Sequence, residues 1–257
     1  MNKIFFISKN GLKLCGIWHI PEKKTDRAII LAHGITVDKD ETGIFIRLAE
    51  KLCTEGFAVF RFDFSGHGES EGSPEGMTIT KEIQDMDAAV DFVKKQYPNI
   101  GLLGASFGGG IATLFVSENE SLIKALCLWN PVLNYDHTFL HPVFPWLKTR
   151  IDDVKKDMES KGFTQIGSRK FRVGKNLFDE MERIKPFEAL KKIGIPSMIL
   201  HGDADDHVPY EDSAEYVKNL TQGKLITLPV ATHGFQNPND DPRAIEKTFT
   251  FFTSHLL

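Results

Sequence analysis

Short apolar runs alternate with segments of helical periodicity along most of this 257-residue chain. The runs predict strands, and the segments between them predict helices because their apolar residues recur three and four positions apart. Strands that alternate with helices form a mostly parallel sheet that is covered on both faces. Strands are predicted at 27–32, 57–62, 100–103, 125–129, 195–200 and 224–228, and helices at 42–55, 79–96, 109–116, 212–220 and 242–252.

A hairpin is predicted in front of this alternation. Residues 3–8 and 12–19 have strand character and flank Asn10-Gly11, a pair of residues typical of tight hairpin turns. The hairpin adds two strands, so the fold class is α/β, with a mostly parallel eight-stranded sheet and helices on both faces.

The alternation breaks between Pro131 and Pro186, a stretch too long for a simple connection. It is rich in aromatic residues and contains charged helical turns such as 152–161. We expect an inserted cap at 131–186 over the C-terminal edge of the sheet, where active sites of open α/β sheets lie. The core domain would then comprise 1–130 and 187–257. An insertion packed on the side of the domain is the alternative.

Composition excludes several classes of partner. The net charge is -4 with acidic and basic residues interspersed, which argues against a nucleic-acid surface. No apolar run has the length of a signal peptide or of a membrane helix. Cys15, Cys53 and Cys127 lie in apolar surroundings without metal-ligand spacing, as expected of buried reduced thiols. We therefore expect a cytoplasmic protein without a membrane partner.

The pentapeptide Gly104-Ala105-Ser106-Phe107-Gly108 stands between a predicted strand and a predicted helix. A serine at such a turn has its hydroxyl forced outward above the sheet, and glycines are needed where a Cβ would meet the neighbouring strand or helix. Ser106 is thus the candidate nucleophile. A serine that only caps the following helix is the alternative.

A serine hydroxyl needs a base that a third group orients. His233 follows the last predicted strand and is the candidate base, although His33, His201 and His207 also lie near strand ends. The segment 201–209 follows the preceding strand and offers three aspartates. Asp205 falls near the loop apex and is the candidate acid, with Asp203, a turn cap, and Asp206, a solvated side chain, left as alternatives.

The order Ser106, Asp205, His233 resembles that of the α/β-hydrolase superfamily, as do the stretches 31–34 and 61–70. The resemblance covers nearly the whole chain outside the insertion. It implies an oxyanion hole made by the backbone N–H groups of Ile35 and Phe107. It also implies that His33 braces a loop rather than acting as a base, and that 63–70 shapes the loop beside the active site.

These residues predict a serine hydrolase that forms an acyl-enzyme on Ser106. No cofactor and no metal is expected, since Gly108-Gly109-Gly110 lacks the spacing of a dinucleotide site. The chain looks most like bacterial cinnamoyl and feruloyl esterases, which implies a small-molecule ester with a small or aromatic acyl group. Alternatives are a thioesterase or monoacylglycerol lipase, a proline-type serine peptidase that holds a substrate amine with Asp152, Asp153 or Glu159, and a non-catalytic binding protein. A homodimer is possible.

Overall fold

The computed structural model describes residues 2–256. Eight strands form one sheet in the order β1-β2-β4-β3-β5-β6-β9-β10. All neighbours from β4 to β10 pair in parallel, whereas β2 is antiparallel to both β1 and β4. The strands of this sheet are β1 (Asn2–Ile7), β2 (Lys13–His19), β3 (Arg27–Ala32), β4 (Ala58–Phe62), β5 (Asn99–Ala105), β6 (Ala125–Trp129), β9 (Ser197–Gly202) and β10 (Gly223–Leu228). The predicted fold class is confirmed.

The larger helices that cover the sheet lie where periodicity predicts them, with ends that shift by a few residues. They are α1 (Ile44–Thr54), α2 (Ile79–Lys94), α3 (Ser106–Asn119), α8 (Tyr210–Tyr216) and α9 (Asp240–Leu256). The predicted hairpin also forms, and Gly11 takes the left-handed conformation that its turn requires, with φ +79°. Within residues 2–256, no helix is both long and apolar enough to cross a membrane.

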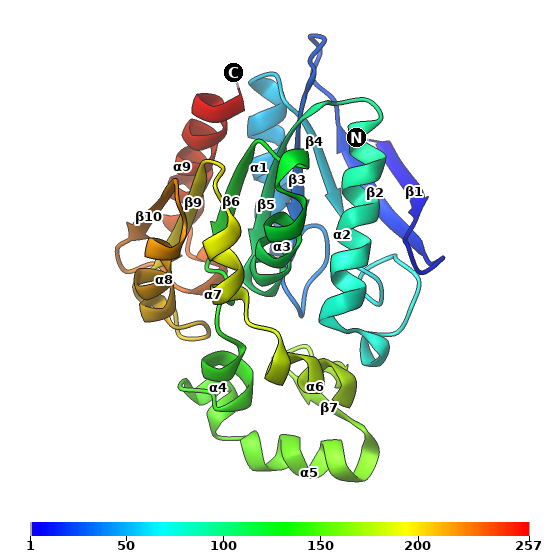
Figure 1. Ribbon diagram of the computed structural model, residues 1–257, viewed down its shortest axis with the longest axis vertical. Coiled ribbons are helices and arrows are strands. Elements are labelled where there is room, and N and C mark those ends of the chain that lie inside the picture. The colour runs from blue at the N-terminus through cyan, green and yellow to red at the C-terminus, as the bar shows by residue number, and fades with distance from the viewer. Residues whose placement is uncertain (1, 257) are drawn as a thin grey trace.

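Helices cover both faces of the sheet, and the alternation of side chains along β3 shows how. Ile29 and Leu31 pack into the core beneath α1 and α9. Ala28, Ile30 and Ala32 point to the opposite face and pack into the core beneath α2 and α3. Figure 1 shows α2 and α3 in front of the sheet, with α1 and α9 on its other side. The strands are therefore buried on both faces and held in a fixed position beneath the loops at their ends.

The segment from 131 to 186, called the insertion below, forms a separate group of elements beyond one end of the sheet (Figure 1). It contains a π-helical turn (Asp136–Leu140), α4 (Pro145–Lys148), α5 (Ile151–Lys161), β7 (Phe163–Ile166), β8 (Phe171–Gly174) and α6 (Lys175–Arg183), and α7 (Pro186–Ala189) leads back to the sheet. Strands β7 and β8 form an antiparallel hairpin that the sequence does not predict. The division into a core and a cap domain stays a prediction.

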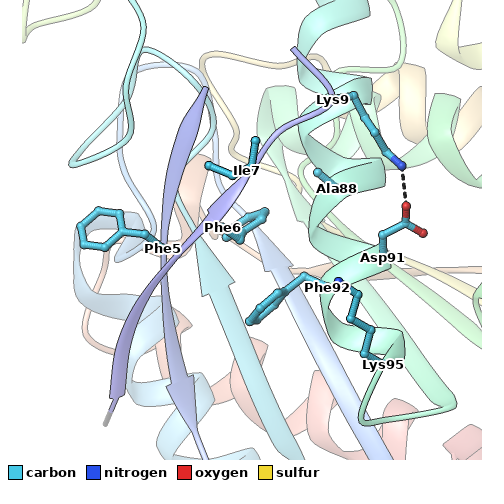
Figure 2. A pocket seen from close by; sticks show the side chains of 8 residues that line it. All are labelled: Phe5, Phe6, Ile7, Lys9, Ala88, Asp91, Phe92 and Lys95. Carbon is cyan, nitrogen blue, oxygen red and sulfur yellow. Dashed lines mark hydrogen bonds and ion pairs between the residues drawn. The ribbon is translucent and has the colours of Figure 1, made fainter. Parts of the chain in front are cut away.

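Strand β1 is an open edge of the sheet and carries two exposed apolar side chains, Phe5 and Ile7, with 45% and 62% of their surface accessible. A pocket of about 390 Å³ lies here, between β1 and α2. Figure 2 shows Phe92 and the Lys9–Asp91 ion pair among its lining residues. Its lining residues are distinct from those around Ser106.

The three cysteines are free thiols. Cys15 and Cys127 are buried as predicted, and burial raises the pKa of Cys127 to about 12. Cys53 is only half-buried, which corrects the expectation for that residue. It lies on α1 close to the exposed end of that helix, where packing is less complete.

Candidate active site

Ser106 lies between β5 and α3 and is the first residue of the helix, three positions earlier than periodicity predicts. Its φ of +51° is in the left-handed region, so the turn is strained, as expected for a serine forced out of a tight strand-to-helix junction. The flanking glycines permit this turn. A Cβ on Gly104 would lie 2.5 Å from the Gly108 carbonyl oxygen, and one on Gly108 would lie 2.3 Å from the His33 carbonyl oxygen.

Three of the predicted side chains meet above the C-terminal edge of the sheet. His233 Nε2 lies 3.0 Å from Ser106 Oγ, and His233 Nδ1 lies 2.7 Å from Asp205 Oδ2. The loops after β9 and β10 carry Asp205 and His233, and these two strands are neighbours in the sheet. Parallel pairing therefore delivers both side chains to the same edge as the serine after β5.

Asp205 is held by the loop that follows β9. Its Oδ1 accepts hydrogen bonds from the backbone N–H groups of His207 and Val208 at 2.9 and 2.8 Å, which leaves Oδ2 to face His233. His201 Nε2 lies 3.2 Å from the same Oδ2.

Charge and burial act in opposite directions on the Asp205–His233 pair. Burial favours a neutral Asp205, but the charges and hydrogen bonds of His233 and His201 outweigh it and hold the Asp205 pKa well below its ordinary value. Burial also lowers the pKa of His233, yet the Asp205 charge and hydrogen bond raise it above the ordinary value. An ionised Asp205 thus supports a proton on His233 Nδ1.

The two alternative aspartates have other partners. Asp203 Oδ1 accepts the backbone N–H of Val230 at 2.6 Å and holds the loop that leads to His233. Val230 has φ +64°, a strained value for a β-branched residue, so this bond fixes an unfavourable turn. Asp206 is exposed and contacts His207 Nδ1 at 2.6 Å. Neither carboxylate is hydrogen-bonded to His233.

His33 and His67 brace the loop after β3. The geometry fits a neutral His33 whose Nδ1–H donates to the Gly34 carbonyl at 2.7 Å while Nε2 accepts the Phe64 N–H at 3.1 Å. Burial keeps the His33 pKa well below its ordinary value, in agreement with that neutral form. His67 Nε2 lies 2.8 Å from the Ile35 carbonyl oxygen, to which it donates. His33 is therefore a bracing residue, as the resemblance implies.

The two backbone groups implied as an oxyanion hole belong to Phe107, directly after Ser106, and to Ile35, directly after Gly34, which packs against Ser106. Phe107 belongs to the first turn of α3, where N–H groups have no partner within the helix. Ile35 follows β3, the strand that pairs with β5, and lines the same cavity as Ser106. Their assignment as oxyanion donors stays a prediction.

Ser106 and His233 open into a cavity of about 520 Å³, a size typical of small-molecule sites. The insertion forms part of its wall with Thr138, Phe139, Trp146 and the tip of the β7–β8 hairpin. The insertion thus lies over the C-terminal edge of the sheet, not on the side of the domain. Asp152, Asp153 and Glu159, named above for a substrate amine, lie on α5 and are not among the lining residues.

Two polar residues of this cavity escape sequence reasoning. The hydroxyl of Thr138 is buried and has no hydrogen-bond partner within residues 2–256. The carboxyl of Glu41 is buried and accepts the Gly34 N–H at 2.8 Å. Burial raises its pKa to about 7, although the Gly34 hydrogen bond and the charge of His233 oppose that effect. Neither residue belongs to a motif, so the sequence carries no signal for them.

In the part of the chain that the structure describes, one group of three side chains has its possible ligand atoms close enough together to hold a metal ion: Asp205, Asp206 and His207. Both carboxylate oxygens of Asp205 are already engaged by protein groups. A metal here would have to displace those contacts, so the group fits a metal poorly. The predictions of no metal and no cofactor stay predictions.

Comparisons with known proteins agree with this arrangement. Est1E from Butyrivibrio proteoclasticus, solved with ferulic acid bound, superposes with a TM-score of 0.85 over 98% of each chain at 25% sequence identity. Monoglyceride lipase of Homo sapiens is 29% identical over 220 residues, 74% of this chain and 69% of the lipase. An acyl transferase of Aliivibrio fischeri is 26% identical over 230 residues, 84% of this chain and 72% of the transferase.

The model of one protein family, described as serine aminopeptidase S33, matches residues 23–240. This match spans the strands that carry all three meeting side chains, and the sheet has the α/β-hydrolase arrangement. The chain therefore belongs to the serine aminopeptidase S33 family of α/β hydrolases and is a hydrolase of the serine esterase and lipase type.

Proposed function

We propose that this chain is a serine carboxylic ester hydrolase that acts through an acyl-enzyme on Ser106, with small or hydroxycinnamoyl-type aromatic acyl groups as its preferred substrates. The observation that carries the proposal is the hydrogen-bonded series Ser106–His233–Asp205, which opens into a substrate-sized cavity.

The proposed reaction proceeds in two halves. Ser106 Oγ attacks the ester carbonyl carbon as its proton passes to His233 Nε2, and the carbonyl oxygen becomes an oxyanion that accepts hydrogen bonds from Ile35 and Phe107 N–H. The carbon–oxygen bond to the alcohol then breaks, and the alcohol takes the proton from His233. Water repeats the sequence on the acyl-enzyme, and the carboxylic acid leaves. Asp205 stabilises the imidazolium and its orientation throughout.

The preference for an aromatic acyl group rests on the cavity wall and on one relative. Phe139 and Trp146 bring two aromatic rings into the cavity, with centroids 5.9 Å apart in an edge-to-face arrangement. Such rings favour an aromatic ligand. Thr138 also lines the cavity, and its buried hydroxyl has no hydrogen-bond partner within residues 2–256, so we propose that it bonds a polar substituent on that ligand. Est1E, which matches almost the full length of this chain, has ferulic acid bound.

A monoacylglycerol lipase is the second candidate. The observation in its favour is the identity of 29% with human monoglyceride lipase, which covers 74% of this chain. The same serine, histidine and aspartate would act in both cases, and the two candidates differ in the length and polarity of the acyl group that the cavity accepts.

A hydrolysis panel separates the candidates. The purified protein is assayed with acetyl, butyryl, octanoyl, cinnamoyl and feruloyl esters, with acyl-CoA, with a monoacylglycerol and with a proline amide. Our proposal predicts the highest kcat/KM on the feruloyl and short-chain esters. Higher kcat/KM values on octanoyl and monoacylglycerol substrates would identify the protein as a lipase instead. Turnover of acyl-CoA or of the amide above that of the esters would identify a thioesterase or a peptidase.

A substitution tests the proposed contact with the acyl group. Thr138→Val removes a hydroxyl while keeping the shape of the side chain, so kcat/KM for the feruloyl ester should fall about five- to tenfold, the value of one hydrogen bond. The unsubstituted cinnamoyl ester should be affected less than about twofold. Thr253→Val is the matched control, since Thr253 also has a buried hydroxyl without a partner in residues 2–256 but lies on α9, outside the cavity. Equal losses on both esters would contradict this contact.

A further inference from the structure

The segment Gly34-Ile35, which carries the proposed oxyanion donor, has four backbone polar groups, and three of them are hydrogen-bonded. The Gly34 N–H donates to Glu41 Oε2 at 2.8 Å, the Gly34 carbonyl accepts from His33, and the Ile35 carbonyl accepts from His67. The fourth group, the Ile35 N–H, has no hydrogen bond to another residue between 2 and 256. The loop is thus built to leave this one donor available.

Glu41 differs from the other two braces because its own backbone is strained. Glu41 has φ +44° and the next residue, Thr42, has φ +55°, both in the region that disfavours side chains. The Thr42 hydroxyl donates to the Glu41 carbonyl at 2.7 Å and supports this turn. Backbone strain of this kind persists where surrounding contacts impose it, and strained residues are common at functional sites. The turn places the Glu41 carboxyl against the Gly34 peptide, seven residues earlier in the chain.

The Glu41 carboxyl also lies beside the reacting groups. Glu41 Oε1 and Ser106 Oγ are 3.6 and 3.7 Å from the point where a Cβ on Gly34 would stand. Glu41, Ser106 and His233 line one cavity. The charged groups that act on Glu41 are His233, Asp38 and Arg169, and those that raise the pKa of His233 are Asp205, Glu41 and Asp206. No cation is hydrogen-bonded to the Glu41 carboxyl within the described residues.

We propose that Glu41 is a positioning residue of the active site: by holding the Gly34 N–H it fixes the segment that presents the Ile35 N–H as an oxyanion donor, and its charge acts on the protonation of His233. This inference rests on the proposed function, because it gives Glu41 a role in that same reaction.

The sign of the pH effect follows from charge. A carboxylate at Glu41 stabilises the protonated imidazolium of His233, so it raises the pKa of that residue. The base is active only when neutral, so activity on the acidic side follows the titration of His233. Removing the Glu41 charge should therefore lower the pKa of His233 and move the acid limb of the pH profile to lower pH.

Two variants separate the two effects. Glu41→Gln keeps an oxygen that accepts the Gly34 N–H but cannot ionise, so kcat at the pH optimum should stay within about threefold of wild type. Its acid limb in kcat/KM should move down by up to roughly one pH unit, the effect of one nearby charge, and by less where the Glu41 carboxyl, with its pKa of about 7, is already protonated. Glu41→Ala removes the acceptor as well, and kcat should fall on the order of ten- to a hundredfold with little change in KM, as for a disturbed oxyanion donor.

Glu50→Gln is the matched control, because Glu50 is an exposed glutamate on α1 whose carboxyl has no hydrogen bond to other described residues. It should leave both kcat and the pH profile unchanged. The inference is overturned if the acid limb of Glu41→Gln coincides with that of wild type, or if Glu41→Ala folds with an unchanged melting temperature and full kcat. If Glu41→Ala does not fold, the Gln variant alone decides.

Failure of the role proposed for Glu41 is distinguishable from failure of the proposed function. A wild-type protein that hydrolyses esters and loses activity in Ser106→Ala, but shows no effect at Glu41, contradicts only this inference. A wild-type protein without ester turnover contradicts the proposed function itself.

Discussion

Asp205 shows how one side chain is selected from three neighbouring aspartates. The turn after β9 directs its Oδ1 to two backbone N–H groups and its Oδ2 to His233. Asp203 instead holds the strained turn at Val230, and Asp206 stays at the surface beside His207. The three residues have the same side chain, so the difference between them comes from the conformation of the loop.

Asp205→Asn tests this selection. In Asp205→Asn, the side-chain amide donates a hydrogen bond to His233 Nδ1, which places the imidazole proton on Nε2. A protonated Nε2 cannot accept the proton of Ser106. We expect kcat to fall by about three to four orders of magnitude with the fold retained. Asp206→Asn is the matched control and should keep activity within about threefold, as usual for an exposed side chain. Near-normal turnover in Asp205→Asn, together with a large loss of kcat in Asp206→Asn, would show that Asp206 and not Asp205 orients His233.

Among the secondary-structure elements, the β7–β8 hairpin connects the insertion to the loop before α2. Gly174, at the end of β8, packs against Glu75, and a Cβ there would lie 2.1 Å from the Glu75 carbonyl oxygen. Arg172 of β8 forms an ion pair with Glu75. Glu180 on α6 accepts hydrogen bonds from the N–H and hydroxyl of Thr80. These contacts fix the hairpin whose tip forms part of the cavity wall.

Gly174→Ala tests this anchoring. The added methyl group must displace the hairpin from Glu75, so the cavity wall moves while Ser106 and His233 stay in place. We expect kcat/KM for aromatic esters to fall about tenfold or more, because small displacements of a substrate-positioning wall are costly. Acetyl esters, which extend less far into the cavity, should lose less than about twofold.

The control for that substitution is Gly76→Ala in the same loop, where the new Cβ would meet only the flexible end of Lys81 at 3.7 Å. It should behave as wild type. Steady-state kinetics on the two esters, with melting temperatures for all variants, provide the readout. Equal loss on both esters in Gly174→Ala would show that the hairpin supports the whole fold and not the cavity wall.

For the whole molecule, the alternation of strands and helices is enough to predict the sheet and its covered faces, because each strand has an apolar pattern of its own. It does not predict the β7–β8 hairpin, whose strands of four residues are too short to show a period. Ser106 and His233 could be predicted as neighbours because strand order brings strand ends together. Glu41 could not, since its contact with Gly34 depends on two strained residues that the sequence does not mark.

In the proposed function, Ser106 is a nucleophile activated by His233 and Asp205. The most direct test is reaction of the purified protein with a fluorophosphonate, followed by peptide mapping by mass spectrometry. We predict stoichiometric modification on Ser106, absence of modification in Ser106→Ala and strongly slowed modification in Asp205→Asn. A protein that remains unmodified, or that is modified at another residue while Ser106→Ala keeps its esterase activity, would show that Ser106 is not the nucleophile.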